Sequence, residues 1–167
     1  MEKRGLNLEV ITRAAVTLLD QVGLAELSTR RLAAKLGVQS PTLYWHVKNK
    51  AELLDLVAEA ICADAFDIDA TLGWRDRLTS ALRQFHTMHA AHRDTAALLR
   101  ERPPGPARLE QLDTIISTLV DAGLSPTDAA ACARLLTAHV LDSVLDSDHF
   151  EFGVSVIIDG LERRLPR

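Results

Sequence analysis

Between residues 29 and 50 the chain collects side chains that suit contact with nucleic acid. Arg30 carries a planar fork of donors that matches the acceptors of a guanine base or a phosphate. A run shortly after it supplies amides, hydroxyls and aromatic rings, which suit base edges, thymine methyls and phosphates: Gln39, Ser40, Thr42, Tyr44, Trp45 and His46. One of the two large aromatic residues can instead anchor a small core. The composition of this stretch indicates DNA binding.

The apolar pattern predicts three helices in the first fifty residues. They run over residues 8–22, 29–36 and 41–47, with Asn7 and Ser28 as caps and Gly23 and Gly37 as stops. Ser40-Pro41 begins the third helix with a cap followed by proline, and this helix is barely two turns long. A longer fourth helix begins after Asn49. A short basic helix, a turn containing glycine and a second short helix form the helix-turn-helix pattern.

Charge is divided unevenly along the 167 residues. The net charge of the whole chain is −4, which by itself argues against a nucleic-acid binder. Residues 1–50, however, carry +4, and the rest of the chain carries −8. This asymmetry suggests that one end of the chain meets a polyanion while the remainder has another task.

Two segments of this region resemble the DNA-binding domain of the tetracycline-repressor (TetR) family. They are Thr-Arg-Arg-Leu-Ala-Ala-Lys-Leu-Gly-Val at 29–38 and Pro-Thr-Leu-Tyr-Trp-His-Val-Lys-Asn-Lys at 41–50, with Leu-Leu-Asp following at 53–55. The match extends over about residues 7–60, and the second segment resembles the branch that contains the tetracycline repressors themselves. The resemblance implies a dimeric regulator that places its third helix in the major groove of each half-site.

The resemblance also implies individual contacts. Arg30 would read a guanine, and Thr29 would touch a phosphate. Major-groove contacts would come from Ser40, Pro41, Thr42 and Tyr44, and backbone contacts from Trp45, His46 and Lys50. Gln39 and Ser40 replace the acidic-then-Gln pair of the tetracycline repressors, and serine cannot make the bidentate adenine contact of a glutamine. The operator sequence therefore does not transfer.

The remainder of the chain shows helical patterns only, so we expect an all-α fold. The expected division is a helix-turn-helix domain over 1–50, joined by a long helix to a ligand-binding and dimerisation domain within 51–167. The last two helices, 125–146 and 150–165, are apolar over more than one face, which predicts burial against a second copy. The expected interface residues are Ala133, Leu136, Val140, Val144, Phe152, Val156, Ile157 and Gly160.

A small-molecule pocket is implied by the family resemblance. The expected lining is Phe66, Phe85, His86, His89, Leu99, Arg102, Pro103, Ile115 and His139. In the tetracycline repressors the inducer is held with magnesium by His, Asn and Gln side chains. Here those positions fall on Phe66, Ala81, Leu98 or Leu99, and Ile115, which offer no oxygen ligand to such an ion. We therefore expect an apolar, largely metal-free pocket with no cofactor, and magnesium-tetracycline is not the expected effector.

Other chemistry has weaker support. His86, His89 and His92 recur every three residues and invite a metal interpretation, but no carboxylate accompanies them, and solvated or pocket-lining histidines are the alternative. Cys62 and Cys132 stand far apart without a metal-binding spacing, so they are expected to be free thiols. No set of nucleophile, base and orienting group appears, which argues against an enzyme.

Family members usually carry a long loop between the two dimer helices, yet here Asp148 is followed at once by His149. Either the segment that closes the pocket mouth is absent, or the sequence lacks residues there; an intact mass above 18.3 kDa would show the latter.

The sequence thus predicts a cytoplasmic, ligand-responsive, sequence-specific repressor. It would act as a homodimer on a near-palindromic operator in double-stranded DNA and be released by an apolar small molecule. No membrane span or signal peptide is expected. The alternative is a helical protein that binds or sequesters a small molecule and keeps a vestigial helix-turn-helix.

Overall fold

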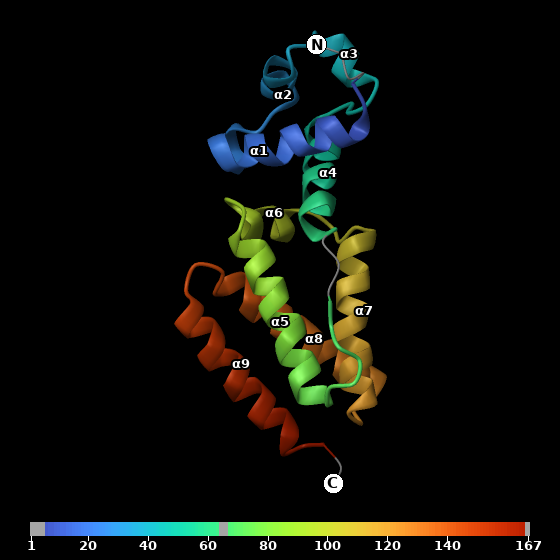
Figure 1. The fold of residues 1–167 in the computed structure, drawn as a ribbon, viewed down its shortest axis with the longest axis vertical. Coiled ribbons are helices and arrows are strands. Elements are labelled where there is room, and N and C mark those ends of the chain that lie inside the picture. Colours follow the sequence, from blue (N-terminus) through green and yellow to red (C-terminus); the bar gives the residue numbers. More distant parts are fainter. Residues whose placement is uncertain (1–5, 64–66, 166–167) are drawn as a thin grey trace. The chain divides into compact units, whose positions relative to one another are not determined.

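The computed structural model describes residues 6–63 and 67–165, and in this part of the chain every regular element is an α-helix (Figure 1). The all-α prediction is confirmed. The chain divides into two compact units, Met1–Ala63 with His92–Gly105, and Asp64–Ala91 with Pro106–Arg167. We call them unit 1 and unit 2. The expected functional division at residue 50 concerns roles rather than packing and stays a prediction.

Unit 1 contains the helix-turn-helix and its support. Its helices are α1 (Leu8–Glu26), α2 (Thr29–Leu36), α3 (Ser40–Tyr44), α4 (Lys50–Cys62) and α6 (Thr95–Glu101). The predicted caps are confirmed, because the side chains of Asn7, Ser28 and Asn49 accept from backbone N–H groups at the starts of α1, α2 and α4. Gly23 has φ +78° and interrupts the helical geometry of α1, near its predicted end. Helix α4 is shorter than expected and ends at Cys62.

The core of unit 1 comes from the inner faces of these helices. Its fully buried side chains include Ile11, Leu19, Leu27, Leu32, Leu43, Leu53 and Val57. Leu32 from α2 and Leu43 from α3 belong to this set, so the two short helices are fixed by burial of few side chains each. The opposite sides of α2 and α3 therefore remain open to a partner.

Unit 1 also includes a segment that sequence reasoning did not assign to it. Residues 92–105, with α6, are anchored to α1 by Asp20, whose carboxylate lies 3.0 Å from His92 Nδ1 and accepts from the Arg93 N–H at 3.1 Å. Asp94 adds a second contact by accepting from the Leu24 N–H at 2.9 Å. Helix α6 was missed because its seven residues are too few to show a clear period.

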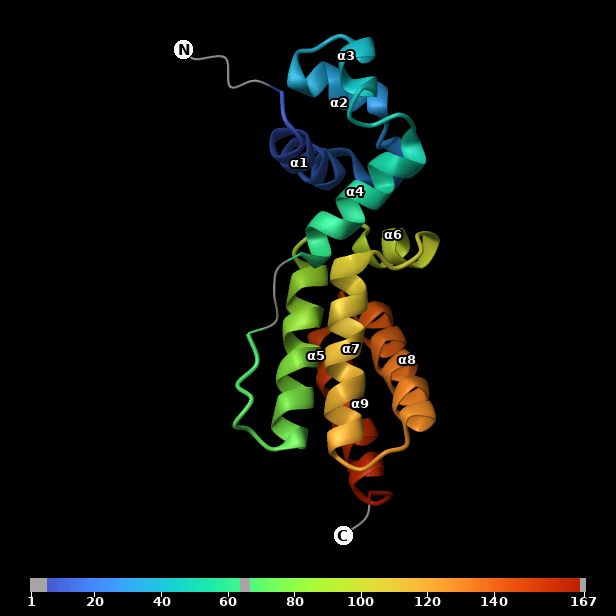
Figure 2. The ribbon, with the colours of Figure 1, turned by 90° about the vertical axis from the view of Figure 1, so that its right-hand side faces the viewer.

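Unit 2 is formed by four longer helices that lie side by side (Figure 2). They are α5 (Trp74–Ala90), α7 (Pro106–Asp121), α8 (Pro126–Asp142) and α9 (Ser147–Glu162). One core joins all four, with Leu82, Phe85, Ile115, Leu136 and Phe150 among its most deeply buried members. Arginines of α5 bind acids of α9 at the surface, in the pairs Arg75–Asp159, Arg75–Glu162 and Arg83–Glu151.

The connection between α8 and α9 is short. Helix α8 ends at Asp142, before its predicted end at 146, and α9 begins at Ser147 instead of Phe150. The earlier start of α9 has a local cause: the Asp146 side chain caps the helix by accepting from the His149 N–H at 2.9 Å.

Two further expectations concern the whole described chain. No helix in residues 6–63 or 67–165 is both long and apolar enough to cross a membrane. Cys62 is buried, Cys132 is half-buried, and neither forms a disulfide in the described part of the chain.

Candidate nucleic-acid interface

The turn between α2 and α3 is built from local backbone requirements. Gly37 ends α2 in the left-handed region with φ +66°, where its missing Cβ avoids strain. Gln39 is the first boundary residue of α3 but makes no capping hydrogen bond with its side chain, and Pro41 lies in the first turn. The exposed Gln39 amide is therefore available to a partner.

The basic residues of α2 differ in their engagement. The Arg31 guanidinium pairs with Glu26, and Lys35 Nζ donates to Gln21 Oε1 at 2.8 Å. Arg30 is exposed, and within the described residues its side chain has no hydrogen-bond or ion-pair partner. An unengaged guanidinium loses no internal bond when it binds a base.

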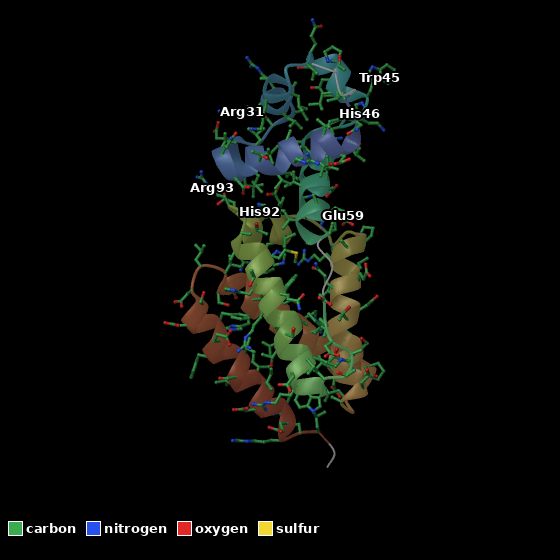
Figure 3. All side chains as sticks on the ribbon, viewed as in Figure 1. Arg31, Trp45, His46, Glu59, His92 and Arg93 are labelled. Atoms are coloured by element: carbon green, nitrogen blue, oxygen red, sulfur yellow. The ribbon has the colours of Figure 1, made fainter. Side chains whose placement is uncertain are left out.

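Large aromatic surface is exposed directly after this helix pair. Tyr44 and Trp45 have exposed fractions of 48% and 86%, so neither is the core anchor that sequence allowed for; Leu43 and Val47 fill that place. Trp45 and His46 project outward at the end of α3 (Figure 3). An isolated Trp at such exposure has no contribution to the core of the single chain.

The start of α4 is organised by reciprocal capping. Asn49 Oδ1 accepts from the Glu52 N–H at 2.9 Å, and Glu52 Oε2 accepts from the Lys48 N–H at 2.8 Å. Lys50 Nζ donates to the carbonyl oxygen of Ala25 at 3.4 Å, which is a long bond. Lys50 is exposed and can exchange this bond for a phosphate.

Five of the predicted ligand residues lie in unit 2. Phe85 and Ile115 are buried, and His89 packs its ring edge to face with Phe85, at 4.1 Å between ring centroids. The other two, His86 and His139, have hydrogen bonds to main-chain carbonyls at the α8–α9 connection.

These two histidines flank one phenylalanine. His86 Nε2 lies 3.1 Å from the carbonyl oxygen of Ser143, and the ring stacks on Phe150 at 4.1 Å. His139 Nε2 lies 3.0 Å from the carbonyl oxygen of Phe150, and its ring occupies the space beside Gly153. Since carbonyl oxygens only accept, both histidines donate through Nε2. Both therefore hold the α8–α9 connection in place.

The remaining predicted ligand residues do not join that set within one unit. Leu99 is buried in unit 1, and Arg102 of the same unit binds the Asp55 carboxylate through two nitrogens, at 2.7 and 2.9 Å. This hydrogen bond raises the pKa of Arg102. Pro103 is exposed, and Phe66 lies outside the described residues.

Sequence reasoning missed buried polar groups on α7. Gln111 and Thr118 are almost fully buried; Gln111 Nε2 lies 3.7 Å from the sulfur of Met88, and Thr118 donates to the carbonyl of Thr114. The signal available was their place on the apolar face of the predicted helix, beside Ile115. As for metal ions, the described part of the chain holds no group of three or more candidate ligands.

The predicted interface residues divide by exposure. Ala133, Leu136, Val140 and Val144 are buried inside unit 2 and stabilise the single chain. Phe152 and Val156 are exposed at 71% and 53%, Gly160 is exposed, and Ile157 is half-buried. Leu135, which was not predicted, is exposed at 56%.

Comparisons with known proteins agree with this geometry. The model of bacterial regulatory proteins of the tetR family matches residues 11–57, and the model of the tetracyclin repressor-like C-terminal domain matches residues 69–149. The class A tetracycline repressor protein from transposon 1721 of Escherichia coli is 37% identical over 159 residues, which cover 90% of this chain and 74% of that protein.

Solved structures give the same result. A single-residue variant of TetR from Acinetobacter baumannii AYE, in complex with minocycline, superposes with a TM-score of 0.87 at 32% identity, covering 98% of this chain and all of the other. BioQ with its double-stranded DNA operator superposes with a TM-score of 0.83 at 32% identity, covering 94% of this chain and 98% of that one.

These matches define a helix-turn-helix transcriptional regulator with an all-helical second domain. The chain belongs to the TetR family. The predicted family and the predicted class of function, a ligand-responsive DNA-binding repressor, are confirmed. The family comprises transcriptional regulators, not enzymes.

Proposed function

We propose that this repressor reads a near-palindromic operator as a homodimer, with α3 in the major groove and Arg30 as its main base-reading residue. The observation that carries this proposal is the contrast within α2: Arg31 and Lys35 are engaged inside the chain, whereas Arg30 is exposed and unengaged in the described structure. Half-sites would lie about one helical turn apart, as for other dimeric helix-turn-helix proteins.

The other contacts follow from position and exposure. The exposed amide of Gln39 is the group best suited to an adenine edge, because Ser40 lacks a second bidentate donor and acceptor. Pro41, Thr42 and Tyr44 would meet thymine methyls or sugars. Backbone phosphates would be held by Thr29, Trp45, His46 and Lys50.

The test starts from selection of operators out of random double-stranded DNA by the purified protein at physiological salt. The affinity of the selected site is then measured for Arg30→Ala and for the matched control Arg31→Ala. Arg30→Ala should lose about 1–3 kcal/mol on the selected site and relax its sequence preference. Arg31→Ala should lose less, because its guanidinium is held by Glu26.

Two results would contradict the assignment. Equal losses for both variants would remove the base-reading role of Arg30. Failure of the folded, dimeric protein to select any sequence would favour a protein that sequesters a small molecule.

We further propose that the effector is an apolar small molecule rather than magnesium-tetracycline. The positions where the resemblance places metal- and drug-binding side chains include Ala81, Leu98, Leu99 and Ile115, which are all buried and apolar. Mg²⁺ requires oxygen ligands and retains waters, so these side chains do not fit it. Addition of tetracycline with Mg²⁺ should leave the protein–operator complex intact; its release would overturn this part.

Ligand would act by favouring a dimer whose two reading heads are wrongly spaced, so DNA affinity falls by its differential affinity for the two states. We expect the protein to act in the cytoplasm, where its operator DNA is accessible.

A further inference from the structure

Helix α9 carries a row of residues that its own chain does not cover. Phe152 and Val156 are exposed at 71% and 53%, and Gly160 is exposed one turn further. Spacing of four residues places all three on one ridge of the helix, the type of ridge that packs into the grooves of another helix. The other sides of α9 are occupied, by the core through Phe150 and its neighbours and by α5 through Arg83–Glu151.

An apolar groove of about 410 Å³ lies next to one end of this ridge, between α8 and α9. It is lined by residues of both helices and by the chain just after α9: Cys132, Leu135, Val156, Ile157, Gly160, Leu161, Arg163 and Arg164. A Cβ built on Gly160 would meet no atom within 4 Å. At Gly153, by contrast, a Cβ would lie 2.1 Å from the His139 ring. The backbone at Gly160 thus borders open space that nothing in the described part of unit 2 fills.

The large side chain and the open space stand at equal distances from Val156. In an isologous contact, residue i of one copy meets residue j of the other, and j meets i. If two copies of α9 cross at Val156, residue 152 of each copy therefore faces residue 160 of the other. The aromatic ring then has a place to enter, and the same contact forms twice.

Charge on the same ridge selects the direction of the two helices. Asp148 and Arg164 lie a further four residues out on either side, both are exposed, and neither has a partner in the described structure. An antiparallel crossing at Val156 brings Asp148 of one copy toward Arg164 of the other. A parallel arrangement would instead place each charge beside its own like charge and Phe152 beside Phe152.

We propose that the occupant of this groove is a second copy of the chain, with α9 crossing α9 antiparallel at Val156 and Phe152 seated beside Gly160 of the other copy. This inference rests on the homodimer of the proposed function and specifies its contact register. It also explains why Gly160 is a glycine although no positive φ is required there.

The register is tested by disulfide trapping in the full chain with Cys132→Ala. Helix axes 8–10 Å apart, less two Cα radii of about 2.3 Å, leave the Cα atoms at the crossing about 3–5 Å apart, which overlaps the range for a disulfide. Val156→Cys should therefore form a covalent dimer under mild oxidation. The matched control Ser155→Cys is also exposed but lies about 100° around the helix, so it should stay monomeric on a denaturing gel.

Sedimentation of the unmodified protein separates the two levels of the proposal. A dimer without trapping at Val156 would overturn the register and leave the homodimer intact. A monomer would overturn both. Trapping at Ser155 as readily as at Val156 would also overturn the register.

A second experiment exchanges the aromatic residue and the glycine. Gly160→Phe places two rings against each other and should abolish the dimer, and Phe152→Gly should weaken it. Because the contact is symmetric, the chain carrying both changes regains one ring and one open space per contact, and should dimerise again. Failure of the double variant to recover, when circular dichroism shows it folded, would contradict the proposed contact.

Discussion

The two regions given functional roles differ in how their residues are brought together. The DNA-reading residues of unit 1 occupy one stretch, residues 29–50, and short-range turn and cap geometry leaves most of them exposed on neighbouring elements. The residues expected to bind ligand come from positions 66–139, and the structure divides those it describes between two units. A site built from adjacent residues is readable from sequence, whereas a site assembled from distant helices depends on packing.

Unit 2 gives the sharpest way to break this comparison, since two of its expected ligand residues hold its own fold. Phe150→Ala removes the ring between His86 and His139, and at 2% exposure the loss should be about 3–5 kcal/mol of the free energy of unfolding. Urea denaturation measures it, with His149→Ala as the exposed control. A loss below about 1 kcal/mol would mean that this site is not packed as described.

Gly153→Ala tests the same region by addition. The new methyl group would lie 2.1 Å from the His139 ring, so the ring and its bond to the carbonyl of Phe150 must shift. We expect a loss of about 1–3 kcal/mol, as for other overpacked sites. Gly160→Ala is the control, because its methyl group meets open space in the single chain, and it should be examined at concentrations where the chain is monomeric.

In unit 1, Lys50→Ala sharpens the distinction between reading and holding DNA. If Lys50 leaves the long bond to Ala25 for a phosphate, the variant should lose affinity equally on all sequences. The slope of log affinity against log salt should fall by about 1. Lys35→Ala is the control, since its ammonium group is engaged by Gln21. A loss confined to the selected operator would give Lys50 a base-reading role instead.

The smallest effect is expected at the surface pair Arg83–Glu151. Hydrogen bonding from Arg83 lowers the pKa of Glu151 below its ordinary value. The charged form therefore stabilises the folded state at pH values above the pKa of the unfolded glutamate, and this contribution disappears as the pH falls through the lower folded value. Because both side chains are about half exposed, Glu151→Gln should cost about 0.2–1 kcal/mol at neutral pH, and the difference from wild type should vanish in acid. A difference that persists in acid would show that the pair is not its cause.

Several features could be predicted from the sequence because their causes are local. The caps at Asn7, Ser28 and Asn49, the left-handed Gly37 and the proline at the start of α3 each act within a few residues. Exposure of Tyr44 and Trp45 together was not predictable, since only the packing of Leu43 and Val47 decided which side chains fill the core.

The sequence by itself determined the helical fold, the family and the contiguous DNA-reading stretch, because backbone propensity, capping and amphipathic period operate along the chain. Tertiary structure alone decided that Asp20 joins residues 92–105 to the DNA-reading unit, that His86 and His139 hold the α8–α9 connection, and that Ala133 and Leu136 belong to the core of the single chain. These outcomes depend on which helix faces meet, and amphipathicity shows that a face must be buried without showing what will cover it.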